Sequence, residues 1–373
     1  MDIDIILEPD VTPTQVAELA VEAEKLGIRA LWSSNYHQHW DCFLALAPAA
    51  AATSKIILGP LAVSPWEQHP LKMANALLTL NELSNGRAMI AVGGGGGVLG
   101  AIGWRTETGG TIWPCYHPVK KTRYPDRRVR GVRECVETLK LARSGEFSSG
   151  YDGGTFVVTR PFIMQWAKSA GPLIYSCSSG PQMIRMGASV ADGIQVSDFT
   201  VDMMPEAMEN VRTGLAKRDD APDDFRIGNF WAWHIKEDRE ASMYEARREL
   251  IWRGAVIGKE EHILRKFIHD ESELDTIMDN WNSFRKASWT RSGNIEGVPE
   301  DLVNRLIAGL SSAGDLKNDL EAELDRFRQF KQSGLTELSL RLHDDPMEGL
   351  RMIAEHVPVS YTHLTLPTIC FKC

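Results

Sequence analysis

Residues 55–97 read KIILGPLAVSPWEQHPLKMANALLTLNELSNGRAMIAVGGGGG, and this stretch decides the fold class. The apolar run over residues 55–63 predicts a strand, and residues 70–83 carry apolar side chains at helical spacing up to the stop signal Asn85-Gly86. Residues 87–92 predict a second buried strand, which runs into five consecutive glycines, Gly93 to Gly97. A strand, a helix and another strand in this order are the building unit of a parallel sheet.

The same alternation continues in both directions along the chain. Further strands are predicted at residues 3–7, 30–34, 173–177, 193–196, 225–235 and 335–342, and further helices at residues 13–26, 41–53, 129–143, 181–190, 205–216 and 346–356. A long insertion covers residues 98–128, a small hairpin covers 146–158, and a mainly helical stretch covers 237–330. Eight strands alternating with helices predict an α/β fold, a (β/α)8 TIM barrel with insertions after strand 4 and between strands 7 and 8. An open doubly wound sheet fits the pattern almost as well, but no GxGxxG follows the first strand.

Composition excludes several classes of function. The chain has 373 residues, 43% hydrophobic and 24% charged, with a net charge of -9 and no basic face, which argues against nucleic-acid binding. Six scattered cysteines, no basic leader and no apolar run long enough for a membrane span predict a reduced, cytoplasmic protein. No His, Cys and carboxylate cluster has the spacing of a metal site.

The C-terminal residues 359–373 differ from the rest of the chain. They read VSYTHLTLPTICFKC, which resembles a translated sequencing-adapter scar, and they show no helical spacing. We therefore expect one domain over residues 1–358, followed by a non-native tail.

Several short sequence motifs carry a family resemblance. Residues 59–70, GPLAVSPWEQHP, and residues 80–88, LNELSNGRA, stand at the third strand and at the turn before the fourth. Residues 178–181, SSGP, stand before a predicted helix, and Ala191-Asp192-Gly193 follows that helix. In this order the motifs resemble those of the luciferase-like oxidoreductases, and most of all those of the deazaflavin-dependent methylenetetrahydromethanopterin reductases. The resemblance covers about residues 1–200 well.

The resemblance implies a coenzyme site at three strand ends. Leu61, Ala62 and Val63 match the segment behind the coenzyme ring, with a non-proline cis peptide expected at Leu61-Ala62. The glycines Gly93, Gly94, Gly95 and Gly96 let a ring or phosphate approach, or form a flexible bridge to the insertion; relatives often carry a carboxylate where Gly96 stands. Cys177, Ser178, Ser179 and Gly180 lie before a helix N-terminus, which suits a phosphate, although an ordinary serine cap gives the same pattern.

Candidate catalytic residues lie at the ends of the first two strands. Glu8 matches a family acid and is either a proton relay or a capping carboxylate. Asn35 and Tyr36 stand where relatives usually have an acid and a histidine, so His37 and His39 are displaced candidates for proton transfer or plain rim histidines. Tyr36 is also placed to donate a hydrogen bond to a substrate oxygen.

The leading hypothesis for function is a coenzyme F-420 (deazaflavin)-dependent oxidoreductase that transfers a hydride to or from a small organic substrate. The alternative within the family is an FMN-dependent monooxygenase that receives reduced flavin from a reductase partner. A third hypothesis is a catalytically silent barrel that binds coenzyme without turnover, because Asn35, Tyr36 and Gly96 depart from the family pattern. The resemblance also implies a homodimer.

Overall fold

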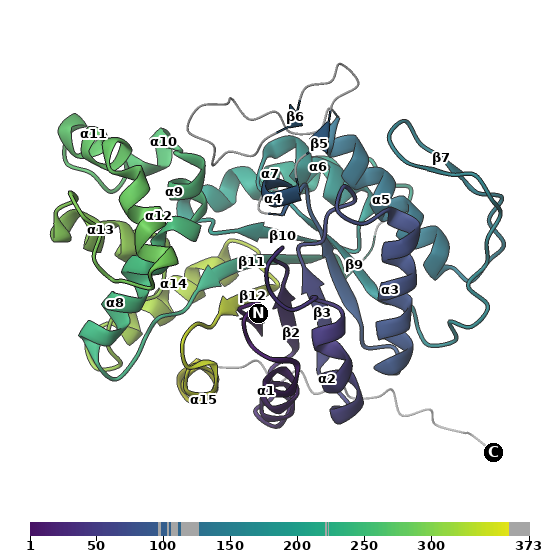
Figure 1. Cartoon of the computed structure of the whole chain (residues 1–373), viewed down its shortest axis with the longest axis horizontal. Coiled ribbons are helices and arrows are strands. Elements are labelled where there is room, and N and C mark those ends of the chain that lie inside the picture. Colours follow the sequence, from purple (N-terminus) through teal and green to yellow (C-terminus); the bar gives the residue numbers. More distant parts are fainter. Residues whose placement is uncertain are drawn as a thin grey trace.

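The computed structural model describes residues 1–95, 98–102, 104–105, 111–112, 127–220, 222 and 224–357. Its centre is an all-parallel sheet of eight strands in the order β3-β2-β1-β12-β11-β10-β9-β4 (Figure 1). The strands are β1 Asp2–Leu7, β2 Ala30–Ser34, β3 Ile57–Leu61, β4 Met89–Val92, β9 Leu173–Cys177, β10 Gly193–Ser197, β11 Arg226–Ala232 and β12 Glu337–Arg341.

The sheet closes into a barrel, which excludes the open doubly wound alternative. The two end strands of the order, β3 and β4, are joined by parallel bridges between Leu58 and Ala88 and between Val63 and Val92. An open sheet would leave these backbone groups unpaired at two edges. The predicted barrel is therefore confirmed, with all eight strands at their predicted places.

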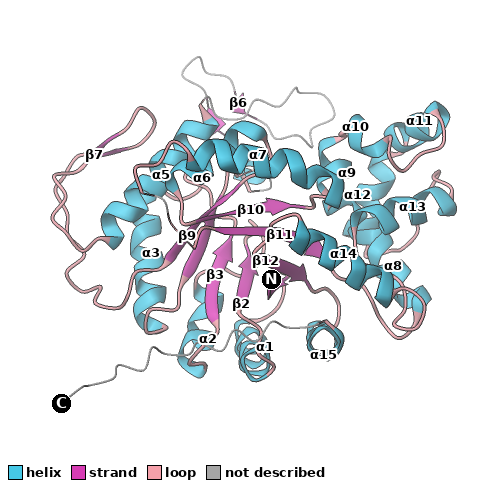
Figure 2. Ribbon diagram, turned by 180° about the vertical axis from the view of Figure 1, so that it is seen from behind, coloured by secondary structure: helices cyan, strands magenta, loops and turns pink. Residues whose placement is uncertain are grey.

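Helices cover the outside of the barrel (Figure 2). They are α1 Pro13–Lys25, η1 Leu44–Leu46, α2 Ala47–Ala52, α3 Pro70–Leu83, α5 Arg128–Arg143, α6 Pro181–Val190, η2 Val201–Met203, α7 Met204–Leu215 and α15 Pro346–His356. Their capping follows the sequence signals: Thr12 and Gln15 form a capping box at the start of α1. The helix predicted over residues 41–53 is instead a 3₁₀ turn followed by α2, because Pro48 in the first turn of α2 has no N–H for an earlier helical bond.

The insertions lie on the strand-end face and at the sides of the barrel. The first insertion, residues 98–128, contains α4 Leu99–Ile102, β5 Trp104–Arg105 and β6 Thr111–Ile112. The second is the predicted hairpin, formed by β7 Tyr151–Asp152 and β8 Val157–Val158. The third forms a helical lobe on the side of the barrel away from that hairpin (Figure 1). This lobe contains α8 Arg239–Glu249, η3 Leu250–Trp252, α9 Gly254–Gly258, α10 Glu261–Leu264, α11 Glu271–Asp279, α12 Trp281–Trp289 and α13 Glu300–Leu310. The last helix before β12, α14 Leu320–Gln332, packs on the barrel instead, with Phe327 and Phe330 in the barrel's main core.

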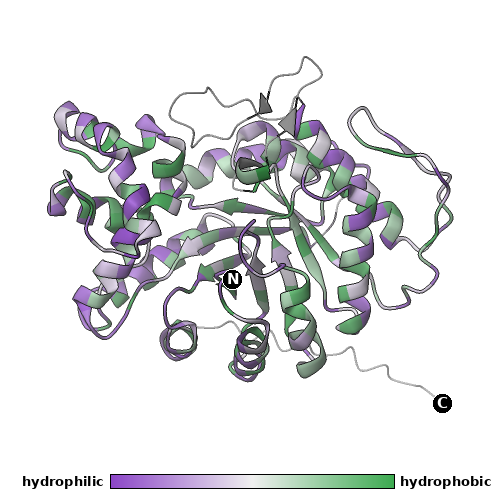
Figure 3. Cartoon of the chain, viewed as in Figure 1, coloured by the Kyte–Doolittle hydropathy of each residue, from purple (hydrophilic) through white to green (hydrophobic). Residues whose placement is uncertain are grey.

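Apolar burial divides into three clusters. The largest lies between the strands and the surrounding helices, the second lies inside the helical lobe, and the third, around Trp32, Tyr175 and Phe230, fills the barrel interior. Figure 3 shows the strands as mainly hydrophobic, while the outer faces of the helices are hydrophilic. The lobe thus has its own core, which allows it to hold side chains rigidly over the barrel.

The N-terminal end of the barrel is filled by a buried ionic network. Arg29 Nη2 lies 2.5 Å from Asp4 Oδ2 and 2.9 Å from Glu337 Oε2, and Arg226 Nε lies 2.5 Å from Glu337 Oε2. Trp32 and Gln195 donate further hydrogen bonds to these carboxylates. With this end filled, a ligand can enter only at the opposite, C-terminal end of the strands, where barrel active sites lie.

Candidate active site at the barrel mouth

The cofactor-binding residues predicted on β3, β4 and β9 meet in space. A Cβ atom built on Gly93 would lie 3.0 Å from Ala62 Cβ and 3.4 Å from Cys177 Cβ. The peptide between Leu61 and Ala62 is cis, as expected from the family resemblance. Strand ends separated by more than a hundred residues therefore lie side by side, and we name them the β3–β4–β9 cradle after their three strands.

Asn35 and Glu67 hold the end of β3 from behind. Asn35 Nδ2 donates to Ala62 O at 3.1 Å and to Glu67 Oε1 at 2.7 Å, and Ser64 N donates to the same Glu67 oxygen at 2.6 Å. Burial raises the pKa of Glu67 to about 7, although these two hydrogen bonds favour the charged form. The Asn35 amide, predicted as catalytic, is thus engaged in supporting the β3 segment.

The predicted phosphate segment splits into an inward and an outward half. The Ser178 side chain is buried and hydrogen-bonded within the protein, to Ser176 Oγ at 3.0 Å and Met183 O at 3.3 Å. Ser179 and Gly180 are exposed, Gly180 is the N-cap of α6, and no side chain caps that helix. Pro181, the first residue of α6, has no N–H, and no side chain caps the N–H groups that follow it, while the space around Gly180 is open. Such an uncapped helix start beside the cradle suits a phosphate.

A polar array, formed by Glu8, Arg341, His343, Glu249 and Arg253, lies across the mouth from the cradle. Glu8 and Arg341 are half-buried and the other three are buried. Arg341 Nε lies 3.4 Å from Glu8 Oε1, and His343 Nδ1 lies 3.8 Å from that oxygen and 4.0 Å from Glu249 Oε2. Burial raises the pKa of Glu8 and of Glu249, and it lowers the pKa of His343 well below its ordinary value. This array can hold or accept a proton inside the mouth.

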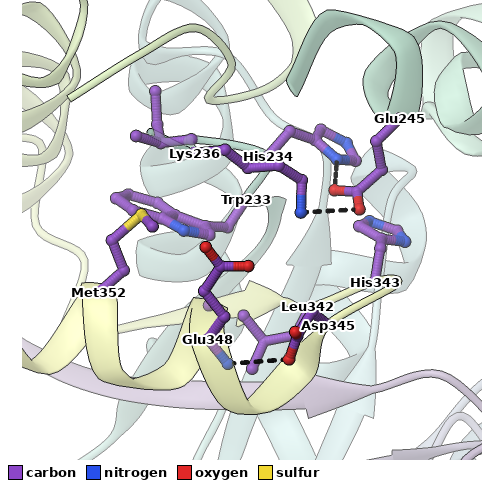
Figure 4. Close-up of a pocket in the computed structure, with 11 residues that line it drawn as sticks. Trp233, His234, Lys236, Glu245, Leu342, His343, Asp345, Glu348 and Met352 are labelled. Atoms are coloured by element: carbon purple, nitrogen blue, oxygen red, sulfur yellow. Dashed lines mark hydrogen bonds and ion pairs between the residues drawn. The ribbon is translucent and has the colours of Figure 1, made fainter. Parts of the chain in front are cut away.

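A second histidine extends this array toward the outside of the barrel. His234 stacks on His343 with ring centroids 4.5 Å apart, and its Nδ1 lies 2.9 Å from Glu245 Oε1. Glu245 Oε2 in turn lies 3.1 Å from Lys236 Nζ. Figure 4 shows these residues around a small pocket between the ends of β11 and β12 and the helix α15. The pocket adjoins the mouth but lies outside the barrel wall.

The remaining candidates from the second strand lie at the rim. Tyr36 packs edge-on against Trp252 of the helical lobe, with ring centroids 5.4 Å apart. His37 and His39 are exposed to solvent. The structure therefore brings Tyr36 to the mouth and leaves both histidines on its outer edge.

Part of the glycine run and of the first insertion lies outside the described residues. Gly96 belongs to this part, as does the tail over residues 359–373. Gly94 is covered by the Arg128 side chain, because a Cβ at Gly94 would lie 2.8 Å from Arg128 Cδ. Among the described residues, no group of three or more His, Cys, Asp and Glu side chains is arranged to hold a metal ion. In the same part of the chain, no helix is long and apolar enough to cross a membrane.

Sequence reasoning missed four residues of this site: Glu67, Glu249, Arg253 and Arg341. Glu67 lies within residues 59–70, one of the motifs that carry the family resemblance, but the sequence does not show that its side chain contacts Asn35. Glu249 and Arg253 come from the helical stretch, where nothing in the local pattern distinguishes them from surface charges. Only the docking of the lobe onto the barrel brings them to the mouth.

The barrel and its mouth correspond to a known family. Residues 3–322 match the family model of the luciferase-like monooxygenases, so the chain belongs to that family and is an enzyme of its oxidoreductase class. The 5,10-methylenetetrahydromethanopterin reductase of Archaeoglobus fulgidus is 25% identical over 326 residues, 84% of this chain and 91% of that relative.

Solved structures agree in fold. The coenzyme F-420-dependent tetrahydromethanopterin reductase from Methanopyrus kandleri superposes with a TM-score of 0.71 at 20% identity, covering 95% of this chain and 98% of that one. The oxygenating constituent of 3,6-diketocamphane monooxygenase from Pseudomonas putida, solved with FMN, gives a TM-score of 0.60 at 17% identity, covering 96% and 98%. These similar proteins therefore include users of coenzyme F-420 and of FMN.

Proposed function

We propose that this protein is a coenzyme F-420-dependent oxidoreductase that transfers a hydride to or from a small organic substrate. The observation that carries the proposal is the β3–β4–β9 cradle beside the uncapped N-terminus of α6. Similarity to a methylenetetrahydromethanopterin reductase over most of both chains supports the choice of coenzyme.

Each part of the mouth has a role in this proposal. Leu61, Ala62 and Val63 would support the back of the coenzyme ring, Gly93 would let it approach, and the N–H groups at Ser179 and Gly180 would hold its phosphate. When bound, the deazaflavin supplies the hydride acceptor or donor. Glu8, whose pKa is raised by burial, is the side chain best placed to exchange a proton with the substrate.

A second candidate is an FMN-dependent monooxygenase supplied with reduced flavin by a partner reductase. The FMN-bound relative of the same fold favours it, and the cradle suits either tricyclic ring. A homodimer is a further family expectation, and its test is the mass of the protein in solution.

Parallel equilibrium titrations with oxidised coenzyme F-420 and with FMN test the proposal. We expect F-420 to bind at micromolar concentration or below, with FMN much weaker. The reverse order would favour the monooxygenase, and binding of neither would overturn both coenzyme assignments. Binding of F-420 without turnover on any donor or acceptor would favour the silent barrel.

A charge variant localises the phosphate. Gly180→Glu places a carboxylate at the N-terminus of α6, where a Cβ meets open space, so the variant should fold while repelling a phosphate. Thr79→Glu adds the same charge on an exposed position of α3 and is the matched control. Coenzyme affinity should fall in the first variant only; an equal affinity in both would place the phosphate elsewhere.

A further inference from the structure

Arg253 is a buried arginine that the helical lobe inserts into the barrel mouth. It follows η3, its side chain is 3% exposed, and its Nη1 donates to Asp198 Oδ1 at 2.8 Å, where β10 ends. Its charge also acts on Glu8 and His343, which follow the ends of β1 and β12. The guanidinium therefore lies among the ends of several neighbouring strands.

Most of the donor capacity of Arg253 has no partner among the residues that the structure describes. Nε and Nη2 are buried and make no hydrogen bond, so the bond to Asp198 is the one that the described residues provide. His343 Nε2, Ser34 Oγ and Glu8 Oε1 are buried without a hydrogen bond as well. Folded proteins satisfy nearly all buried polar groups, because an unpaired one costs about 1–3 kcal/mol. Several such atoms at one strand-end face indicate a place made for a polar ligand.

The charge around these donors favours an anion. Burial raises the pKa of Glu8 and of Glu249, which shifts both carboxyls toward their neutral forms. Arg341, whose pKa is raised above its ordinary value, stays cationic beside them. Asp198 neutralises part of the Arg253 charge, and the raised pKa of Glu8 leaves Arg341 only partly neutralised, so the mouth presents a surplus of arginine charge.

The position of Arg253 separates it from the coenzyme cradle. In the closed strand order, β3, β4 and β9 are consecutive, whereas β10, β11, β12 and β1 form the opposite arc. Arg253 belongs to that opposite arc through Asp198, His343 and Glu8. A group bound there would face a ring in the cradle from across the mouth.

We propose that Arg253 anchors a substrate that carries a carboxylate or a comparable planar oxyanion. This inference rests on the proposed function, because it assigns the substrate side of the same mouth. The free edge of the guanidinium, formed by Nε and Nη2, matches a carboxylate in a two-pronged hydrogen bond, which a neutral amide cannot reproduce. Aromatic side chains at the rim, Tyr36 and Trp252, provide an apolar wall for the rest of the molecule.

Benzoate and benzamide are suitable probes because they share shape and differ in charge. The protein is titrated with each probe, and the rise in its melting temperature measures binding. Benzoate should bind about ten to a hundred times more tightly than benzamide. Arg253→Gln should abolish this preference, and Arg253→Lys, which keeps the charge but loses the planar fork, should retain only part of it. Equal binding of the two probes to the unmodified protein, or unchanged benzoate affinity in Arg253→Gln, would overturn the proposal.

Arg247→Gln is the matched control. Arg247 is a buried arginine of the same lobe whose guanidinium bonds Glu240 and Glu300 instead of facing the mouth. It should change stability without changing the ratio of benzoate to benzamide binding. If Arg253→Gln does not fold, Arg253→Lys and the probe pair on the unmodified protein still decide the matter.

Repeating the titration with coenzyme bound separates the two sources of an oxyanion. A substrate site predicts that benzoate binds the coenzyme-loaded protein as well as the free protein. Competition between benzoate and the coenzyme would instead assign Arg253 to the coenzyme's phosphate and overturn the proposal that Arg253 anchors a substrate. If no coenzyme binds, the proposed function fails, while the probe ratio on the free protein still tests Arg253.

Discussion

The ionisation of Glu67 makes a sharp prediction about stability and pH. Its carboxylate accepts two hydrogen bonds, from Asn35 and Ser64, and burial still raises its pKa from 4.5 to about 7. The folded protein therefore binds this proton more tightly than the unfolded chain. Stability from this group is complete below pH 4.5 and is lost as the pH rises toward 7.

The size of the effect follows from the same pKa values. Moving the pKa from 4.5 to about 7 corresponds to about 3 kcal/mol, at roughly 1.4 kcal/mol for each factor of ten, and this is an upper bound for a half-buried side chain. Between pH 5 and pH 8, the unmodified protein should lose about 2–3 kcal/mol that Glu67→Gln does not lose. The glutamine oxygen can still accept both hydrogen bonds, so the variant removes the charge and keeps the geometry.

Urea unfolding of both proteins at several pH values measures the difference. The two stability curves should converge near pH 5 and separate toward pH 8, with Glu67→Gln the more stable at high pH. Parallel curves across this range would refute the reasoning, because they would show that Glu67 titrates alike in the folded and unfolded states.

Three further variants or reactions test other parts of the structure. Glu337→Ala should cost about 3–5 kcal/mol in chemical denaturation, because it removes the fully buried carboxylate that Arg29 and Arg226 share and leaves them only Asp4 and Asp2; a loss below 1 kcal/mol would count against the network. Cys177, whose pKa is raised by burial to about 12, should be alkylated at pH 8 at least about a hundred times more slowly in the folded than in the unfolded protein, as followed by mass spectrometry. Gly59→Ala should lower the melting temperature, at a cost of about 1–3 kcal/mol or more, because its Cβ would lie 2.4 Å from Met89 O. Gly180→Ala, where the Cβ meets open space, is the control, and equal melting temperatures would contradict the packing argument.

The sequence by itself determined the strands, their order along the chain and the end of the barrel at which the candidate site lies. Alternating strand and helix patterns are local, and a parallel sheet necessarily brings all strand ends to one face. The motifs of the family resemblance also predicted the cis peptide at Leu61-Ala62 and named Ala62, Gly93 and Cys177, which the structure brings together.

Tertiary structure alone decided which atoms of the predicted residues remain free for chemistry. Ser178 turns inward while Ser179 stays exposed, and the Asn35 amide is used by Ala62 and Glu67. A side chain's partners come from distant segments, so no pattern within one segment can reveal them.

The largest contribution of the tertiary structure is the arc opposite the cradle. Arg253 and Glu249 lie in a helical stretch whose sequence pattern does not distinguish them from surface charges. They enter the mouth because the lobe packs its own core and docks on the ends of β10, β11 and β12. Their burial, the unpaired donors of Arg253 and the raised pKa of Glu249 all arise from that docking, because charge environment depends on contacts in space and not on neighbours in the chain.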